Sequence, residues 1–212
     1  MVLRLAEYLE VPMRERNDLL VAAGHAPCYR ETSLDAAELG PVRDSLQLLL
    51  TAHEPCPAVV VDRQWTLVLG NRAVPLFTAG VAPHLLEPPA NVQRLTLHPD
   101  GMAARIINLG EVRHHLLARL SRQALLTGDP ALAALSAELA GYPGGRPGEV
   151  ARGFEPIMTV RLRSEHGELS FFSTIATFGA PADITVSELA IETFHPADAP
   201  TAAALRTLLP AS

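Results

Sequence analysis

The sequence predicts an α+β fold, a five-stranded antiparallel sheet with helices on one face, preceded by N-terminal helices. In the first fifty residues, apolar side chains recur at a spacing near 3.6, which is typical of amphipathic helices. Two short strand-like runs follow, and alternation with period two returns in the last third of the chain. With 48% apolar and 19% charged residues, the 212-residue chain has enough apolar side chains for a core, which excludes wholesale disorder.

The N-terminal part is expected to contain three helices. The first ends near Glu10, because Val11-Pro12 interrupts the apolar pattern. The second covers about residues 12–23 and begins with a proline, which the first turn of a helix tolerates well. A linker rich in turn formers follows, and the third helix is expected to begin near Asp35 and to end at residues 53–57.

Strand and turn signals come next. Ala58–Asp62 and Trp65–Leu69 are predicted to form a hairpin with Asp62 at the start of its turn. Asn71 is expected to cap a short helix through Phe77. The elements expected after it are a loop, three helices and a second loop, in the order Gly80–Ala90, Asn91–Leu97, Glu111–Leu126, Pro130–Ala140 with Asp129 as its cap, and Tyr142–Glu149.

The last third of the chain is expected to be mainly β-structure. Ile157–Ser164 and Leu169–Phe178 flank Glu165-His166-Gly167 and are predicted to form an antiparallel hairpin. A further strand is expected over Ile184–Phe194, and a terminal helix over Thr201–Leu209. Two strands, a helical crossover and a three-stranded meander are the element order of a PAS-type sensor domain, in which a small-molecule pocket lies between sheet and helices.

Charge and cysteine content narrow the classes of function. All seventeen basic residues are arginines, and twenty-three acidic residues bring the net charge to −6, which argues against binding phosphate backbones unaided. Cys28 and Cys56 form no spaced metal or redox motif and are typical of reduced cytoplasmic thiols. The apolar runs are too short for a membrane helix, and the first residues do not resemble a secretory signal. We therefore expect a cytoplasmic protein without membrane contact.

No constellation in the sequence points to catalysis or to a metal ion. His114-His115 project about 100° apart on a helix, and His53-x-x-Cys56 lacks a second pair of ligands nearby. No Gly-x-Ser-x-Gly elbow and no nucleophile with an adjacent base is recognisable. We therefore expect no enzyme activity, no cofactor and no metal.

A polar segment at Asn91, Arg94 and His98 is more informative. Offsets of three and four residues place these side chains on one helix face, and the planar fork of Arg94 suits a carboxylate. In one interpretation they contact the polar head of a ligand. In the other, Asn91 caps the helix, Arg94 holds a loop and His98 bonds to the backbone at the following turn. The residues alone leave both interpretations open.

The apolar residues of the alternating strands also have two interpretations. They line a ligand pocket or they fill a core, and core is the ordinary role of an alternating stripe. The candidates on both sides of such a pocket are Met158, Val160, Leu162, Phe171 and Ile175 on the strands, and Val112 and Leu116 on the long helix.

Several blocks of the sequence resemble one known family. LAEYLEVPMRERNDLLVAAGHAPCY at Leu5–Tyr29 resembles the last two helices of a xenobiotic-response-element-type helix-turn-helix domain. Three later blocks resemble the ligand-binding domain of MmyB-like transcription regulators, namely PAVVVDRQWTLVLGNRAVPLF at Pro57–Phe77, NVQRLTLHPDGMAARIINLGEV at Asn91–Val112 and SELAIETFHPADAPTAAALRTL at Ser187–Leu208. The blocks match in the right order, and together they cover essentially the whole chain.

The resemblance implies a DNA-binding helix-turn-helix joined to a PAS-like domain that holds a small apolar ligand, with a fatty acid as the leading candidate and no catalysis. Residues 1–30 would then be the end of the helix-turn-helix domain, 31–56 a linker helix and 57–212 the PAS-like ligand-binding domain. A homodimer is expected. The family motifs fall on Asn91, Arg94, His98, Pro99 and Gly101, and on Trp65 and Asn71.

The chain departs from the family in its N-terminal part. Only the last two helices of the DNA-binding domain are recognisable, so the helix that would enter the major groove should lie before Met1. The first fifty residues carry five arginines and eight acidic residues, a net charge of −3. This chain alone is therefore expected not to bind operator DNA, which the parent protein would contact only through the missing helices.

Two other functions stay open at this point. The first is a PAS-like dimerisation or interaction module without a ligand, whose core is filled by its own side chains, such as Phe171 and Phe172. The second is a small enzyme with an unrecognised site.

Overall fold

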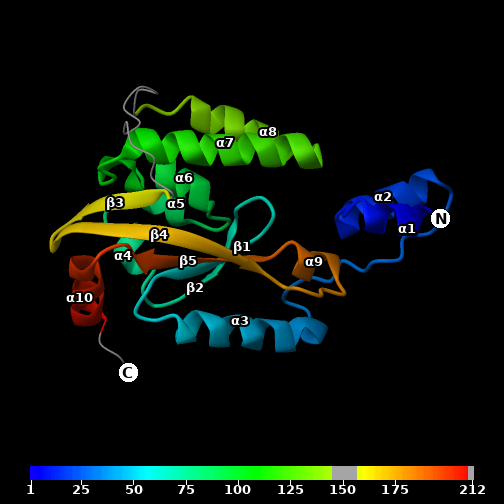
Figure 1. Cartoon of the computed structure of the whole chain (residues 1–212), viewed down its shortest axis with the longest axis horizontal. Coiled ribbons are helices and arrows are strands. Elements are labelled where there is room, and N and C mark those ends of the chain that lie inside the picture. The colour runs from blue at the N-terminus through cyan, green and yellow to red at the C-terminus, as the bar shows by residue number, and fades with distance from the viewer. Residues whose placement is uncertain (145–156, 210–212) are drawn as a thin grey trace.

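The computed structural model describes residues 1–144 and 157–209, and a five-stranded antiparallel sheet lies at its centre (Figure 1). The strands are β1 (Ala58–Val61), β2 (Leu67–Gly70), β3 (Thr159–Ser164), β4 (Gly167–Thr177) and β5 (Ala190–Pro196). Their order across the sheet is β2-β1-β5-β4-β3. The first and last strands along the chain are therefore neighbours in the middle of the sheet.

Helices cover both faces of this sheet (Figure 1). One face carries α4 (Pro75–Thr78), α5 (Pro83–Leu86), α6 (Val92–Leu97), η2 (Met102–Ala104), α7 (Leu109–Thr127) and α8 (Pro130–Ala140). The other face is covered by α3 (Gly40–Ala52), which follows the 3-10 turn η1 (Ala37–Leu39). The predicted layer of helices is thus present on one face. The third of the expected N-terminal helices, α3, forms a second layer on the other face.

Each face of the sheet has its own hydrophobic core. Because side chains alternate along a strand, β1 contributes Val59 and Val61 to the larger core beneath α7, and Val60 to the smaller one. In the smaller core Val60 packs with Leu46 and Leu50 of α3. The apolar run of β1 is therefore buried on both sides, which explains its lack of polar residues.

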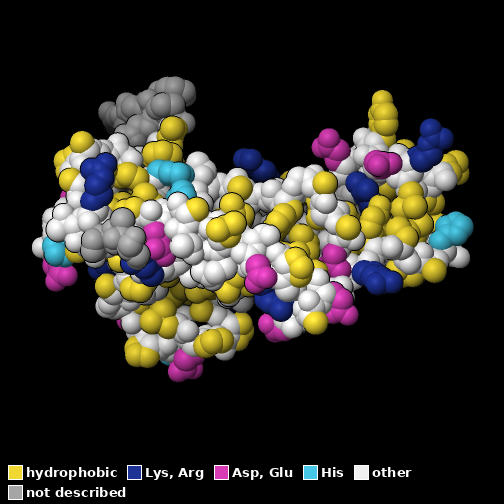
Figure 2. Space-filling view, turned by 90° about the horizontal axis from the view of Figure 1, so that it is seen from below, with side chains coloured by type: hydrophobic (Ala, Val, Ile, Leu, Met, Phe, Trp, Pro, Cys, Tyr) yellow, Lys and Arg dark blue, Asp and Glu magenta, His cyan; other side chains and the backbone are white. Residues whose placement is uncertain are grey.

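The N-terminal helices α1 (Val2–Tyr8) and α2 (Met13–Ala22) stand at one end of the molecule, away from the sheet (Figure 1). Apolar side chains gather on the surface of this part (Figure 2), and the exposed ones include Leu5, Tyr8, Leu9, Leu19 and Val21. The linker behind them is bonded to the sheet domain, since the Thr32 hydroxyl donates to Asp183 Oδ2 at 2.7 Å and the Ile184 amide donates to the Arg30 carbonyl at 2.8 Å.

The predicted fold class is confirmed, and several local signals act as expected. Gly128 ends α7 with φ of 65°, a left-handed conformation that favours glycine. Asp129 caps α8 by accepting a hydrogen bond from the Ala131 amide. Asp62 begins the β1–β2 turn, where its Oδ1 accepts hydrogen bonds from the amides of Gln64 and Thr66.

The strand expected over Ile184–Phe194 is wrong in its first half. Residues Ile184–Ser187 form the short helix α9, and β5 begins only at Ala190. Asp183 explains the difference, because its Oδ1 accepts a hydrogen bond from the Thr185 amide and so caps a helical turn. After β5 the chain ends in α10 (Ala199–Leu208), close to the expected terminal helix.

Three smaller expectations also need correction. Trp65 is not in the second strand but in the turn before it, with φ of 65°, and β2 begins at Leu67. Asn71 does not cap α4, which begins at Pro75 with Val74 as the preceding residue. The third helix begins at Gly40 rather than near Asp35, because the residues between form a bend and the 3-10 turn η1.

The two segments expected to be loops are described to different extents. Gly80–Ala90 contains the single helical turn α5, and Tyr142–Glu149 lies outside the described residues from position 145 onward. Within the described ranges, no helix is both long and apolar enough to cross a membrane. The division of the chain at residues 30 and 56 stays a prediction.

Candidate ligand-binding site

One face of the sheet brings together the apolar residues that the sequence singled out. Val160 of β3 lies opposite Phe171 of β4, and Ile175 of β4 lies opposite Glu192 of β5, so these residues point to the same side. This is the side of the larger core, beneath α7. We call it the sensor face, and define it by Met158, Val160, Leu162, Phe171, Ser173, Ile175 and Glu192 of the sheet, with Val112 and Leu116 of α7 above them.

Burial divides the sensor face into a filled part and an open part. Phe171 is fully buried and packs edge to face on Phe77, with 5.3 Å between ring centroids. Leu162, Val112 and Leu116 are buried as well. Val160 and Met158 are only half-buried, and Ile175 is 44% exposed. The filled part is ordinary core, whereas the open part leaves apolar surface free for a ligand or a partner.

Trp65 closes one end of the sensor face. Its side chain is buried, and its Nε1 donates a 2.8 Å hydrogen bond to Gln123 Oε1 of α7. Gln123 in turn donates to the Arg63 carbonyl at 2.9 Å. The guanidinium of Arg119 stacks on the indole, with its Cζ 4.1 Å from the ring centroid. Trp65 therefore ties the β1–β2 turn to α7.

A pair of opposite charges, of which the carboxylate is buried and the guanidinium half-buried, lies beside this tryptophan. Glu192 projects from the central strand β5 and is 7% exposed, and Arg119 Nη1 lies 3.9 Å from its Oε1. Burial raises the pKa of Glu192, and the nearby Arg119 guanidinium and Ser173 hydroxyl offset this only in part. Burial also lowers the pKa of Arg119, against the effect of Glu192. A polar group thus sits in the middle of an otherwise apolar face.

Arg94 and His98 are brought together, but against α8 rather than on the sensor face. Arg94 donates two hydrogen bonds to Glu138, from Nε at 2.8 Å and from Nη2 at 2.7 Å. The ring of His98 packs on Tyr142 with 4.9 Å between centroids. Hydrogen bonds from Arg94 lower the pKa of Glu138, while burial and its bond to Glu138 raise the pKa of Tyr142 to about 12. These contacts clamp α6 to the end of α8.

Asn91 and His98 make the contacts that are expected if they cap the helix and bond to the backbone of the following turn. Asn91 Oδ1 accepts hydrogen bonds from the amides of Gln93 and Arg94, so Asn91 caps α6, and its Nδ2 donates to the Gln64 carbonyl. His98 Nδ1 accepts a hydrogen bond from the Asp100 amide at 3.0 Å. The next motif residue, Gly101, has no room for a side chain, because an added Cβ would lie 2.4 Å from the Leu95 carbonyl oxygen.

Asn71 is buried between the sheet and the end of α3. Its Nδ2 donates to the carbonyls of Leu50 and Cys56, and its Oδ1 accepts from the Ala58 and Ala73 amides. This set of bonds joins β1 to α3. The binding of a ligand by Asn71, Asn91, Arg94 or His98 stays a prediction.

The histidines show one further grouping within the described residues. Ligand atoms of His84, His98 and Asp100 lie within 4.8 Å of one another at the turn after α6. Coordination through Nδ1 of His98 would have to replace its hydrogen bond from the Asp100 amide. His53, by contrast, packs its ring edge to face on His195 with 4.9 Å between centroids. His98 and His53 thus both contact other residues of the chain through their rings.

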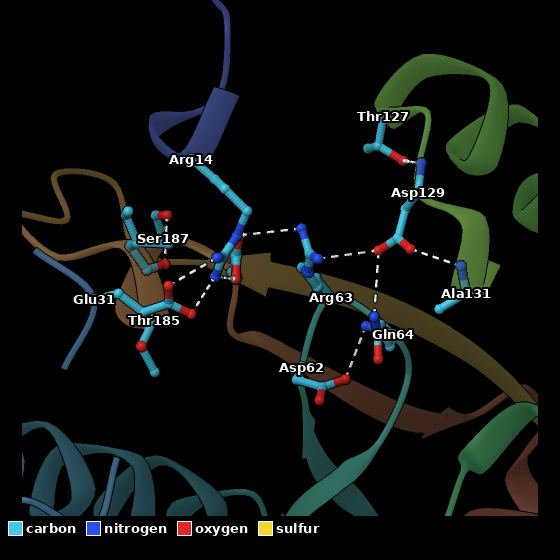
Figure 3. A network of polar contacts seen from close by, with 12 residues as sticks. Arg14, Glu31, Asp62, Arg63, Gln64, Thr127, Asp129, Ala131, Thr185 and Ser187 are labelled. Atoms are coloured by element: carbon cyan, nitrogen blue, oxygen red, sulfur yellow. Dashed lines mark hydrogen bonds and ion pairs between the residues drawn. The ribbon is translucent and has the colours of Figure 1, made fainter. Parts of the chain in front are cut away.

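A second polar network joins the sheet domain to the N-terminal helices (Figure 3). Arg14 of α2 donates to Glu188 from Nε at 2.7 Å and to Glu31 from Nη1 at 2.8 Å. Arg63 of the β1–β2 turn lies 3.7 Å from Glu188 Oε1 and 3.2 Å from Asp129 Oδ2. The network thus runs from α2 to the N-terminal cap of α8 and joins residues of five separate segments.

The sequence profile of one family, the MmyB-like transcription regulator ligand binding domain, matches residues 42–208, well over half of the chain. The chain belongs to this family. No curated protein matches it. The matched residues include all five strands and α4 to α10, so the sensor face lies within the MmyB-like domain. This family is a class of regulator domains and not a class of enzymes. The resemblance of Leu5–Tyr29 to a helix-turn-helix domain lies outside the match and stays a prediction.

Two residues of the MmyB-like domain, Arg119 and Glu192, were not predicted from the sequence to lie at the candidate site. A signal for Glu192 was present, because Ala190, Glu192 and Phe194 alternate with Ile191 and therefore share one face of a strand. An acidic residue in a short apolar strand is unusual when that face is buried. Arg119 had no such signal, since an arginine on a long helix is most often exposed.

Proposed function

We propose that this MmyB-like domain is the ligand-sensing part of a cytoplasmic transcription regulator, and that it binds a small apolar molecule, such as a fatty acid, between the sensor face and α7. The observation that carries the proposal is the open part of the sensor face, where Ile175 is 44% exposed beside a closed apolar core. A ligand would cover this surface, and each buried CH₂ of its chain would contribute about 0.8 kcal/mol.

The proposed contacts differ between the two parts of the sensor face. Met158, Val160 and Ile175 would contact the ligand chain directly, because their side chains are not fully covered by the protein. The buried residues Leu162, Phe171, Val112 and Leu116 would form the wall behind it, and Trp65 would close one end. Arg94, Asn91 and His98 would act by holding α6 in place, and Asn71 by joining the sheet to α3.

Adjacent residues on β4 provide a matched test of this proposal. Ile175→Asp places a charge on the sensor face, whereas Ala176→Asp places the same charge one residue along the strand and on the opposite face. Both positions are exposed, so both variants should fold. We expect Ile175→Asp to weaken binding of a long-chain fatty acid by at least about tenfold, and Ala176→Asp to leave it unchanged, in isothermal titration of protein stripped of lipid. Equal affinities of the two variants would contradict the proposal.

One observation favours the alternative, an interaction module without a ligand. Phe77 packs edge to face on both Phe171 and Phe194, so three aromatic rings of the chain itself fill one end of the core. Native mass spectrometry of protein purified without detergent separates the two functions. A co-purified small molecule supports the sensor, and a dimer with no added mass supports the interaction module.

The proposal for DNA concerns the parent regulator. We propose that α1 and α2 are the last helices of its helix-turn-helix domain and that homodimerisation presents two such domains to an operator. Within their bounds α1 and α2 hold three arginines and three acidic residues, so they have no basic excess, which supports a position outside the groove because phosphate contacts need basic residues.

A further inference from the structure

The pair formed by the half-buried Arg119 and the buried Glu192 is incompletely bonded. Its closest approach, 3.9 Å between Arg119 Nη1 and Glu192 Oε1, is too long for a hydrogen bond. Arg119 Nη2 is buried, and among the described residues it has no hydrogen-bond acceptor. Buried polar groups in folded proteins are almost always hydrogen-bonded. A buried donor without an acceptor, next to a carboxylate too distant to bond with it, therefore indicates that a further polar group binds between them.

Arg119, one member of the pair, is also reachable from outside. Arg119 borders a groove of about 960 Å³ between the N-terminal helices and α7. The groove has apolar walls, with Leu9, Val11 and Leu19 on one side and Leu126 on the other. On the sheet, the exposed Ile175 lies directly opposite Glu192 in the strand register. A polar site therefore adjoins apolar surface that is open to an amphipathic molecule.

The charges at this place select the kind of polar group that fits. Arg119 and Glu192 balance each other, and the groove adds Arg122 against Glu10, Glu15 and Asp18. A further anion would therefore meet an excess of negative charge, and a cation would have to displace Arg119 from Glu192. An uncharged group that both accepts and donates a hydrogen bond meets neither obstacle, since it accepts from Arg119 and donates to Glu192.

We propose that the polar end of the ligand is held between Arg119 and Glu192, and that it is an uncharged hydrogen-bonding group such as a hydroxyl, a primary amide or a protonated carboxylic acid. The inference rests on the proposed sensor function and moves the head-group contact from Arg94 to Arg119. The guanidinium of Arg94 already donates two hydrogen bonds to Glu138, whereas Arg119 Nη2 lacks an acceptor within the described residues.

The test compares straight-chain alcohols, primary amides and methyl esters of equal length. Their affinities are measured by displacement of a fluorescent apolar probe from the full chain. An ester accepts hydrogen bonds but donates none, so we expect it to bind about tenfold more weakly than the alcohol or the amide. Equal binding of alcohol and ester would overturn the inference, and this comparison needs no variant.

A double variant then assigns the preference to the pair. Arg119→Met with Glu192→Met removes both charges together, so neither is left buried alone and the fold is retained. Alcohol and ester should bind this variant with similar affinity, while Arg94→Met should keep the tenfold preference. Survival of the preference in the double variant would also overturn the inference. If no member of the series binds the wild-type chain, the proposed function itself is wrong.

Discussion

Two arginines of the helical layer, Arg94 and Arg119, form different kinds of pair with a glutamate. Arg94 and Glu138 are partly exposed and joined by two hydrogen bonds, which lower the pKa of Glu138. Glu192 is buried, Arg119 is half-buried, and the two lack a direct hydrogen bond, so burial dominates and raises the pKa of Glu192. The two glutamates therefore affect the free energy of unfolding with pH dependences of opposite sign. Hydrogen bonds dominate the pKa of Glu138, whereas burial dominates the pKa of Glu192.

The Arg94–Glu138 pair predicts a loss of stability in acid. Because the folded-state pKa of Glu138 is lowered, its contribution is present above the ordinary glutamate pKa of about 4.3 and is lost as the pH falls through the lower folded value. We expect Arg94→Met to lower the free energy of unfolding by no more than about 1 kcal/mol at neutral pH, given the solvent exposure of both side chains.

Urea unfolding at neutral pH and below about pH 4 measures this difference. The wild type and Arg94→Met should converge in acid, because a protonated Glu138 no longer pairs with the guanidinium. Arg4→Met, which changes an exposed arginine of α1, serves as the control and should show no such convergence. A gap between wild type and Arg94→Met that is constant over the pH range would contradict the role of the pair.

At the scale of elements, α2 depends on ion pairs for its position against the sheet domain. Within α2 only Leu20 is buried, while Leu19 and Val21 are exposed. Arg14 supplies the long-range bonds, to Glu188 beyond α9 and to Glu31 in the linker (Figure 3). Glu188 also lies near Arg63, which pairs with Asp129 at the cap of α8. A shift of α8 would therefore move the ion-pair partners of Arg14 and change how α2 is held.

We expect Arg14→Ala to release α2 from the sheet domain without unfolding the sheet. Partly buried, multiply bonded arginine pairs are worth about 1–2 kcal/mol, so amide exchange over residues 13–22 should rise by roughly tenfold. Hydrogen–deuterium exchange followed by mass spectrometry measures this. Exchange in β4 should not change, and Arg4→Ala should leave both segments as in the wild type. Unchanged exchange over residues 13–22 in Arg14→Ala would exclude the network as the attachment of α2.

At the scale of the whole molecule, the sensor face and the N-terminal helices lie in different parts of the chain. The sensor face lies in the MmyB-like domain, and α1 and α2 extend from one end of it (Figure 1). This arrangement suits a domain that passes a signal to an attached DNA-binding unit. It does not suit a chain that grips DNA by itself, because the net charge is −6 and the first fifty residues share that sign.

We therefore expect the 212 residues alone to show no sequence-specific binding to operator DNA. A gel-shift titration at low and moderate salt checks this, since binding through phosphate contacts weakens steeply as salt rises. A complete helix-turn-helix regulator with its own operator is the positive control for the assay. A specific, salt-sensitive shift with the 212 residues alone would contradict the expectation.

Much of the fold was predictable because its signals are local. Proline, glycine and aspartate at helix ends located α7 and α8 to within about two residues, and alternation located the β3–β4 hairpin. The local errors have local causes as well. Asp183 caps a helical turn within an apolar run that resembles a strand, and the bonds of Asp62 place Trp65 in a turn. The apolar half of the candidate site was predictable for the same reason, since one strand face carries it.

The sequence by itself determined the helical and strand periods, the turns and the set of apolar residues that share the sensor face, because these depend on neighbours a few positions away. Only the tertiary structure decided which charges meet. The sequence alone named no partner for Arg94, and the approach of α8 places Glu138 within hydrogen-bond distance of it. Arg119 and Glu192 are 73 residues apart, and β5 brings them together by inserting between β1 and β4. Such pairings follow from packing between distant segments, which no local pattern encodes.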